Sequence, residues 1–196
     1  LYEKLEARYP FGRYAQQALL ESSYAYYKFD EPESAIATLD RFINTYPRHP
    51  HLDYAFYLKG LANFNRGKSF VDRILPRDQS ERDAGAAKQS FFDFQELARR
   101  FPDSRYAKDA VLRMQYLRNT LAAYEINVAD YYMRRGAYVA AVNRAKYVIE
   151  HYQRTPAVPE ALDVMVRGYR KLGLENLAAD ALRVYRSNYP ERAAEL

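Results

Sequence analysis

Apolar side chains recur every three or four residues along most of the chain, as they do in amphipathic α-helices. Between residues 35 and 46 they form one stripe, made up of Ala35, Ile36, Leu39, Phe42, Ile43 and Tyr46. The opposite face carries Asp40, Arg41, Asn44 and Thr45. Pro47 then ends the helix, because proline has no N–H to donate, and the next apolar run begins at Leu52. This stretch predicts two helices joined by a turn.

The same pattern divides the rest of the chain into helices. The predicted hairpins are 13–29 with 31–46, 104–135 with 137–152, and 160–172 with 174–189. Residues 50–66 should pair with 86–101 across a polar insertion, 67–85, and 153–159 should form a turn. The stretch 104–135 lacks Pro and Gly, so it predicts one long helix or two kinked ones, and Gly136 predicts a left-handed residue at its end.

Three tyrosine pairs share one spacing and reveal a repeat: Tyr26 and Tyr46, Tyr132 and Tyr152, Tyr169 and Tyr189. An alanine follows the first tyrosine by nine residues in each case, at Ala35, Ala141 and Ala178. A small or compact residue precedes it by three, at Ser23, Ala129 and Val166. This is the frame of a tetratricopeptide (TPR) repeat. It predicts an all-α fold, a right-handed α-solenoid of about four and a half TPR helix hairpins.

We expect one continuous solenoid with two functional halves. The N-terminal half, 1–102, would hold a truncated first repeat, the insertion and a substrate groove, and the C-terminal half, 103–196, a docking region. Residues 1–9 read as the end of a helix, so any targeting segment should lie upstream. Concave repeat surfaces bind peptides or other proteins, although this is an analogy at the level of the fold.

Composition excludes several classes of function. The chain has no Cys, and therefore no disulfide, thiolate zinc site or thiol nucleophile. Its net charge of +5 comes from charges that alternate in sign, which disfavours nucleic-acid binding and leaves an RNA-binding repeat a distant third hypothesis. No apolar run is long enough to span a membrane.

Catalytic and metal-binding motifs are also missing. His49 and His51 flank Pro50 in a predicted turn and should be exposed, without the further ligands that a metal site needs. The acidic residues should lie on solvent-facing helix surfaces, with no catalytic pair. The sequence therefore predicts no enzyme, no cofactor and no metal.

The tyrosines suggest a binding groove. Tyr24, Tyr26 and Tyr27 cannot all face one way on a helix, so if Tyr26 fills the hairpin interface its neighbours point elsewhere. Tyr24, Tyr27, Tyr54 and Tyr57 would then line an aromatic groove for an extended peptide. The alternative is that these side chains pack between repeats.

Several longer motifs resemble one family, BamD (ComL), the TPR lipoproteins of the β-barrel assembly machinery in the outer membrane of Gram-negative bacteria. The matching stretches are RYPFGRYAQQA at 8–18, AYYK at 25–28, DRFI at 40–43, P-x-HP-x-x-DYAFYLKGL at 47–61, SERD at 80–83, SFFDF at 90–94, FPDSRYAKDA at 101–110 and YEINVADYYMRRGAYVAAVNRA at 124–145. They span nearly the whole chain, and the insertion falls where the family has one.

The resemblance implies a non-enzymatic scaffold of five TPR units, most of the first missing here, on the periplasmic face of the outer membrane. Its only membrane attachment would be a lipidated N-terminal Cys upstream of residue 1. The C-terminal half would dock on a POTRA domain of BamA, and the N-terminal half would receive C-terminal segments of unfolded outer-membrane proteins. Other lipoproteins, such as BamC or BamE, would accompany it.

For the BamA contact, the resemblance implies Arg144, which matches a family position that pairs with an acidic POTRA residue. Asn143, Arg134 and Arg135 are nearby candidates. The alternative function is a generic TPR adaptor that binds another peptide in the cell envelope or cytosol. A native N-terminus with a signal peptide and lipobox Cys would favour the first function, and a direct cytosolic start the second.

Overall fold

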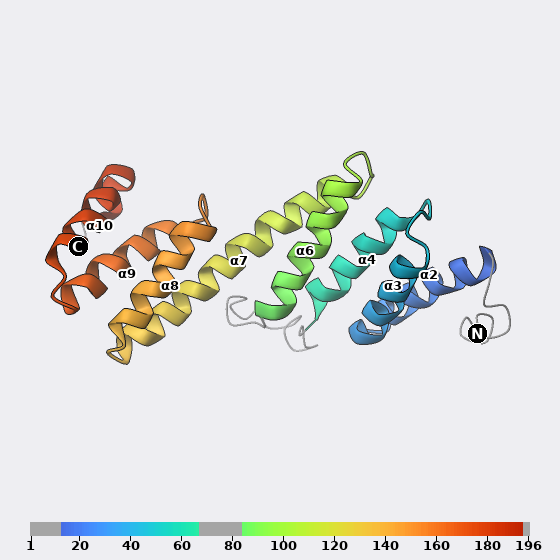
Figure 1. Cartoon of the computed structure of the whole chain (residues 1–196), viewed down its shortest axis with the longest axis horizontal. Helices are drawn as coiled ribbons and strands as arrows, with labels where there is room; N and C mark the ends of the chain where they lie inside the picture. Colours follow the sequence, from blue (N-terminus) through green and yellow to red (C-terminus); the bar gives the residue numbers. More distant parts are fainter. Residues whose placement is uncertain (1–12, 67–83, 194–196) are drawn as a thin grey trace. The chain divides into compact units, whose positions relative to one another are not determined.

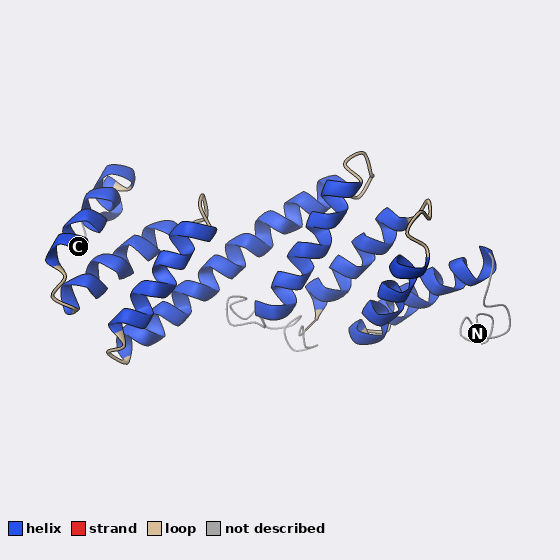
Figure 2. Ribbon diagram, viewed as in Figure 1, coloured by secondary structure: helices blue, strands red, loops and turns tan. Residues whose placement is uncertain are grey.

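The computed structural model describes residues 13–66 and 84–193, and within these ranges it contains nine helices and no strand (Figures 1 and 2). In order they are α2 (Arg13–Lys28), α3 (Pro32–Thr45), α4 (Leu52–Asn65), α6 (Ala84–Arg100), α7 (Ala107–Arg134), α8 (Tyr138–His151), α9 (Val158–Lys171), α10 (Glu175–Asn188) and α11 (Pro190–Ala193). The predicted all-α class is confirmed, and α7 is one long helix rather than two.

Most helix ends differ from the prediction by one to three residues, and three further differences matter for the fold. α6 begins at Ala84, inside the predicted insertion, whose residues 67–83 lie outside the described part of the chain. Pro159 belongs to the first turn of α9 rather than to the preceding turn, because a proline there loses no helical hydrogen bond. The short helix α11 was not predicted.

The turns after α7 and α9 use glycine in the same way. Gly136 has φ +73° and Gly173 has φ +71°, a left-handed conformation in which a Cβ is strained. The Ala137 N–H donates to Tyr132 O, and the Leu174 N–H donates to Tyr169 O, so each turn caps its helix with a backbone bond. The prediction for Gly136 is confirmed.

The chain forms two compact units, which divide within α7 between Leu117 and Arg118. In the first unit, α2 packs on α3, α3 on α4 and α4 on α6; in the second, α8 packs on α9 and α9 on α10. The small repeat positions are all buried: Ser23, Ala35, Ala129, Ala141, Val166 and Ala178. Consecutive packing with buried small residues is the arrangement of TPR-like hairpins. The two functional halves and the right-handed sense stay predictions.

A close approach joins α4 to α6, the two helices that flank the insertion. A Cβ added to Gly60 would lie 2.5 Å from Cε1 of Phe94, and Phe94 is fully buried. The Ser90 hydroxyl donates to the Gly60 carbonyl at 2.9 Å, directly beside this contact. Glycine is therefore required at position 60 because it lets the Phe94 ring lie against the α4 backbone.

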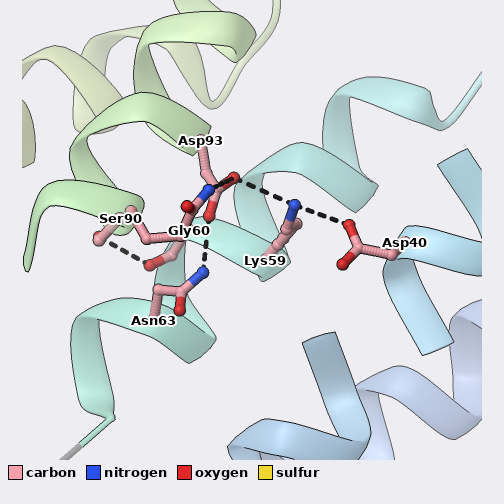
Figure 3. A network of polar contacts seen from close by, with 7 residues as sticks. Asp40, Lys59, Gly60, Asn63, Ser90 and Asp93 are labelled. Atoms are coloured by element: carbon pink, nitrogen blue, oxygen red, sulfur yellow. Dashed lines mark hydrogen bonds and ion pairs between the residues drawn. The ribbon is translucent and has the colours of Figure 1, made fainter. Parts of the chain in front are cut away.

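A polar network links α3, α4 and α6 (Figure 3), and it is buried at Asn63 and Asp93. Lys59 Nζ lies 2.7 Å from an Asp40 carboxylate oxygen and 3.3 Å from Asp93 Oδ1. Asp93 also accepts hydrogen bonds from the Asn63 amide at 2.7 Å and the Gln89 amide at 3.2 Å. Lys59 of α4 thus connects an acidic residue of α3 with an acidic residue of α6, the two helices that pack against α4.

Asp93 is only 4% exposed, which contradicts the prediction that acidic residues lie on solvent-facing surfaces. Burial raises the pKa of Asp93, and its bonds to Lys59, Asn63 and Gln89 only partly oppose that rise. Burial alone would lower the pKa of Lys59, but Asp40 and Asp93 together raise it above its ordinary value. A carboxylate is tolerated inside because three donors surround it.

Candidate functional site

A pocket of about 960 Å³ opens in the first unit. Its walls come from α2, the turn before α4, the start of α4 and the turn before α7. Its lining residues include Tyr24, His49, Tyr54, Arg105 and Tyr106. The pocket is aromatic and polar rather than purely apolar.

Tyr24 and Tyr54 are the two predicted groove residues that line this pocket. Tyr24 is 43% exposed, and the Tyr54 ring lies 5.7 Å from the Tyr106 ring. Burial, followed by the neighbouring Tyr106, raises the pKa of Tyr54 to about 12. Its hydroxyl therefore stays protonated at physiological pH and can donate or accept a hydrogen bond.

Tyr27 and Tyr57 are held in packing instead. Tyr57 stacks on Tyr106 with ring centroids 4.6 Å apart, and its hydroxyl donates to Asp109 at 2.7 Å. The Tyr27 hydroxyl accepts from the Asn65 amide at 3.1 Å. The four predicted tyrosines thus divide, two at the pocket and two in contacts between helices.

Sequence reasoning missed Arg105 and Tyr106, although a signal was present. Tyr46-Pro47 and Phe101-Pro102 are equivalent turns, and each is followed by a helix that begins five residues after the proline. Their backbone bonds correspond, with Leu52 N–H donating to His49 O and Ala107 N–H donating to Ser104 O. Both turns line the pocket, so residues 105 and 106 match positions 50 and 51.

His49 corrects a further prediction, since it is half-buried rather than exposed. Its ring meets Phe42 edge-on at 5.0 Å, and Nδ1 accepts the His51 backbone N–H at 3.1 Å. Burial, and then the charge of His51, lowers the pKa of His49. Among the residues that the structure describes, no group of three or more acidic, His or Cys side chains is arranged to hold a metal.

In the second unit, Arg144 is paired within the chain. Its Nη1 donates to a Glu125 carboxylate oxygen at 2.9 Å, and Glu125, on α7, is 2% exposed. This buried Glu125 is a second exception to the predicted solvent-facing acids, and the guanidinium compensates its charge. The Arg144 side chain is itself about half exposed. Helix α8 therefore presents to solvent a guanidinium that the buried Glu125 of α7 holds in place.

The other docking candidates lie at two different places in the second unit. Asn143 is exposed beside Arg144 on α8, whereas Arg134 and Arg135 lie at the end of α7, at the tip of the hairpin. Arg135 lies over the Tyr131 ring, 5.8 Å from its centroid. Arg144 lies six positions after Tyr138, the first residue of α8, so the tip is about 9 Å from Arg144 along the helix.

Antiparallel helix hairpins packed in chain order, with buried small residues at repeat positions, define this protein as a TPR-like helical-repeat protein. Residues 1–184 match the YfiO family, described as outer membrane lipoprotein, and the chain belongs to that family. The resemblance to BamD (ComL) is confirmed. None of the helices in the described ranges combines the length and apolar character of a membrane span.

Similar proteins carry one name, "Outer membrane protein assembly factor BamD". The relative from Neisseria meningitidis serogroup B is 48% identical over 191 residues, covering 97% of this chain and 72% of its own. The Xylella fastidiosa Temecula1 relative is 42% identical, covering 97% and 65%, and the Vibrio cholerae relative is 39% identical, covering 88% and 71%. The name denotes assembly rather than a reaction, in agreement with the prediction of no enzyme.

Proposed function

We propose that this protein is a non-enzymatic scaffold of the outer-membrane β-barrel assembly complex. It would stand on the periplasmic face, tethered by an upstream lipid anchor, with BamA and other lipoproteins such as BamC or BamE as partners. The name shared by its relatives supports the assembly role. The pocket lined by Tyr24 and Tyr54 is the observation that carries the substrate-receiving part of the proposal.

The pocket suits an extended segment that ends in an aromatic residue. Tyr24, Tyr54 and Tyr106 offer ring faces, and Arg105 is exposed at the wall and can meet a carboxylate. Arg105 already donates to the Tyr106 hydroxyl and lies 4.7 Å from its ring centroid, which holds it at the wall. A C-terminal segment of an unfolded outer-membrane protein has the matching chemistry.

A photo-reactive side chain at position 24 is expected to capture a peptide with a C-terminal aromatic residue, because Tyr24 is exposed and lines the pocket. Position 92 is the matched control, since Phe92 is an exposed aromatic residue of the same unit that does not line the pocket. Cross-linked product is measured by mass spectrometry. Equal capture at both positions would show that the pocket is not the peptide site.

Docking on BamA would centre on Arg144 and Asn143. Arg144 is suited to an acidic partner residue because a guanidinium has donors to spare after its bond to Glu125. The bond to Glu125 also changes the choice of variant. Arg144→Glu would leave the buried Glu125 facing a second carboxylate, so a loss of binding could come from a loss of fold.

We expect the double variant Glu125→Gln/Arg144→Gln to weaken binding to the BamA POTRA region about ten-fold or more, since it removes the guanidinium without leaving a buried charge. Glu125→Gln alone is the control, because it keeps Arg144. Calorimetric titration gives the affinities, and thermal unfolding checks that both variants fold. If the double variant binds like the control, Arg144 is not a docking residue.

A further inference from the structure

The C-terminal ends of α7 and α9 lie on the same side of the second unit. α8 and α9 are antiparallel neighbours, so α7 and α9 end on the same side, away from the turn between α8 and α9 (Figure 1). A Cβ at Gly168, near the end of α9, would lie 3.8 Å from both Met133 Sδ and the Tyr138 carbonyl oxygen. The turns at Gly136 and Gly173 therefore form one tip of this unit.

Four cationic side chains lie at this tip: Arg134, Arg135, Arg170 and Lys171. All four are exposed, and none forms an ion pair with another residue in the described ranges. They occupy the ends of α7 and α9, where the partial negative charge of a helix C-terminus favours cations. Glu175, at the start of α10, is the acidic residue nearest in sequence to the second turn.

The same turns expose aliphatic side chains. Val139, in the first turn of α8, is 60% exposed, and Leu174, which precedes α10, is 44% exposed. Exposed aliphatic residues among cations that form no ion pair are typical of surfaces that lie on a membrane, where the cations meet phosphates and the aliphatic side chains enter the interface.

We propose that this tip, the membrane-facing tip, binds the surface of an anionic phospholipid bilayer. A membrane fits better than an acidic protein because none of the four cations has an ion-pair partner among the described residues, in contrast to Arg144, which Glu125 orients. Cations without an ion-pair partner suit a diffuse layer of headgroup charge, whereas recognition of one carboxylate favours a guanidinium held in place. The chain belongs to an outer membrane lipoprotein family, which agrees with a position near a bilayer surface.

The test is co-sedimentation of the full chain with vesicles of phosphatidylethanolamine and phosphatidylglycerol, and with vesicles of phosphatidylcholine alone. Each basic residue near an anionic surface contributes roughly a five-fold gain in partitioning, so Arg170→Gln/Lys171→Gln should lower binding about 25-fold. Lys146→Gln/Arg186→Gln is the matched control, because it removes two exposed cations elsewhere in the unit. The control should bind within a few-fold of the unchanged protein.

Anionic-vesicle binding that fails with the tip variant, survives in the control and weakens with salt would support the proposal. Val139→Ser/Leu174→Ser should also reduce binding, which separates insertion from simple charge attraction. Equal loss in the two charge variants would overturn the proposal, since net charge alone would then explain binding. Absence of binding to anionic vesicles would overturn it too, and would favour an acidic protein partner for the tip.

Discussion

Replacing Lys59 by methionine is expected to destabilise the protein by about 3–5 kcal/mol near neutral pH, because it leaves the buried Asp93 carboxylate without a cation. Lys59 is the only cation within ion-pair distance of Asp93 among the described residues. The Asn63 and Gln89 amides remain as donors, but neither carries charge. Urea unfolding at about pH 7 measures the change.

The loss of unfolding free energy caused by Lys59→Met should become smaller as pH falls. The pKa of Asp93 is already raised by burial, and the loss of the lysine raises it further. A raised folded-state pKa contributes stability that is fully present below the unfolded pKa and is lost as pH rises through the folded pKa. The stability of the variant therefore approaches that of the unchanged protein as pH falls from neutrality through the raised pKa of Asp93.

The control is Asp93→Asn/Lys59→Met, which removes both charges and should be more stable than Lys59→Met at neutral pH. Its stability difference from the unchanged protein should vary little over this pH range, since the titrating group is gone. A deficit of Lys59→Met that stays constant with pH would show that Asp93 is not the origin of the effect.

Phe94→Ala is expected to cost about 3–5 kcal/mol, because it empties a fully buried site against the α4 backbone. Phe92→Ala is the matched control in the same helix, and its exposed ring predicts a change within about 0.5 kcal/mol. Urea unfolding of the full chain compares the two.

Gly60→Ala tests the same contact from the other helix. Its methyl group meets the Phe94 ring and should cost about 1–3 kcal/mol, less the gain of about 1 kcal/mol in helix propensity. In Gly60→Ala/Phe94→Ala the methyl group fills space that the ring has left, so the double variant should cost less than the sum of the single changes. Strict additivity would contradict a direct contact.

The sequence predicted the helices well because each stripe of apolar residues must face a neighbour, as the buried Ala35, Leu39 and Phe42 of α3 do. It did not predict the buried carboxylates of Asp93 and Glu125. Their compensating cations, Lys59 and Arg144, lie far away in sequence, so no local pattern reports the pairing.

The candidate pocket could be predicted in part for a similar reason. The tyrosine pattern marked Tyr24, Tyr27, Tyr54 and Tyr57 as a group, but helical spacing alone does not say which rings find a partner. Tyr57 instead bonds to Asp109 and stacks on Tyr106, which lie about 50 residues later in the chain. Tyr24, by contrast, lines the pocket and is 43% exposed.

Purification of the full-length protein from the membranes of its native host tests the proposed assembly role most directly. A tagged, unchanged protein should retain BamA in stoichiometric amount, Glu125→Gln should retain it as well, and Glu125→Gln/Arg144→Gln should lose most of it. Failure of the unchanged protein to retain BamA would contradict a scaffold in this complex.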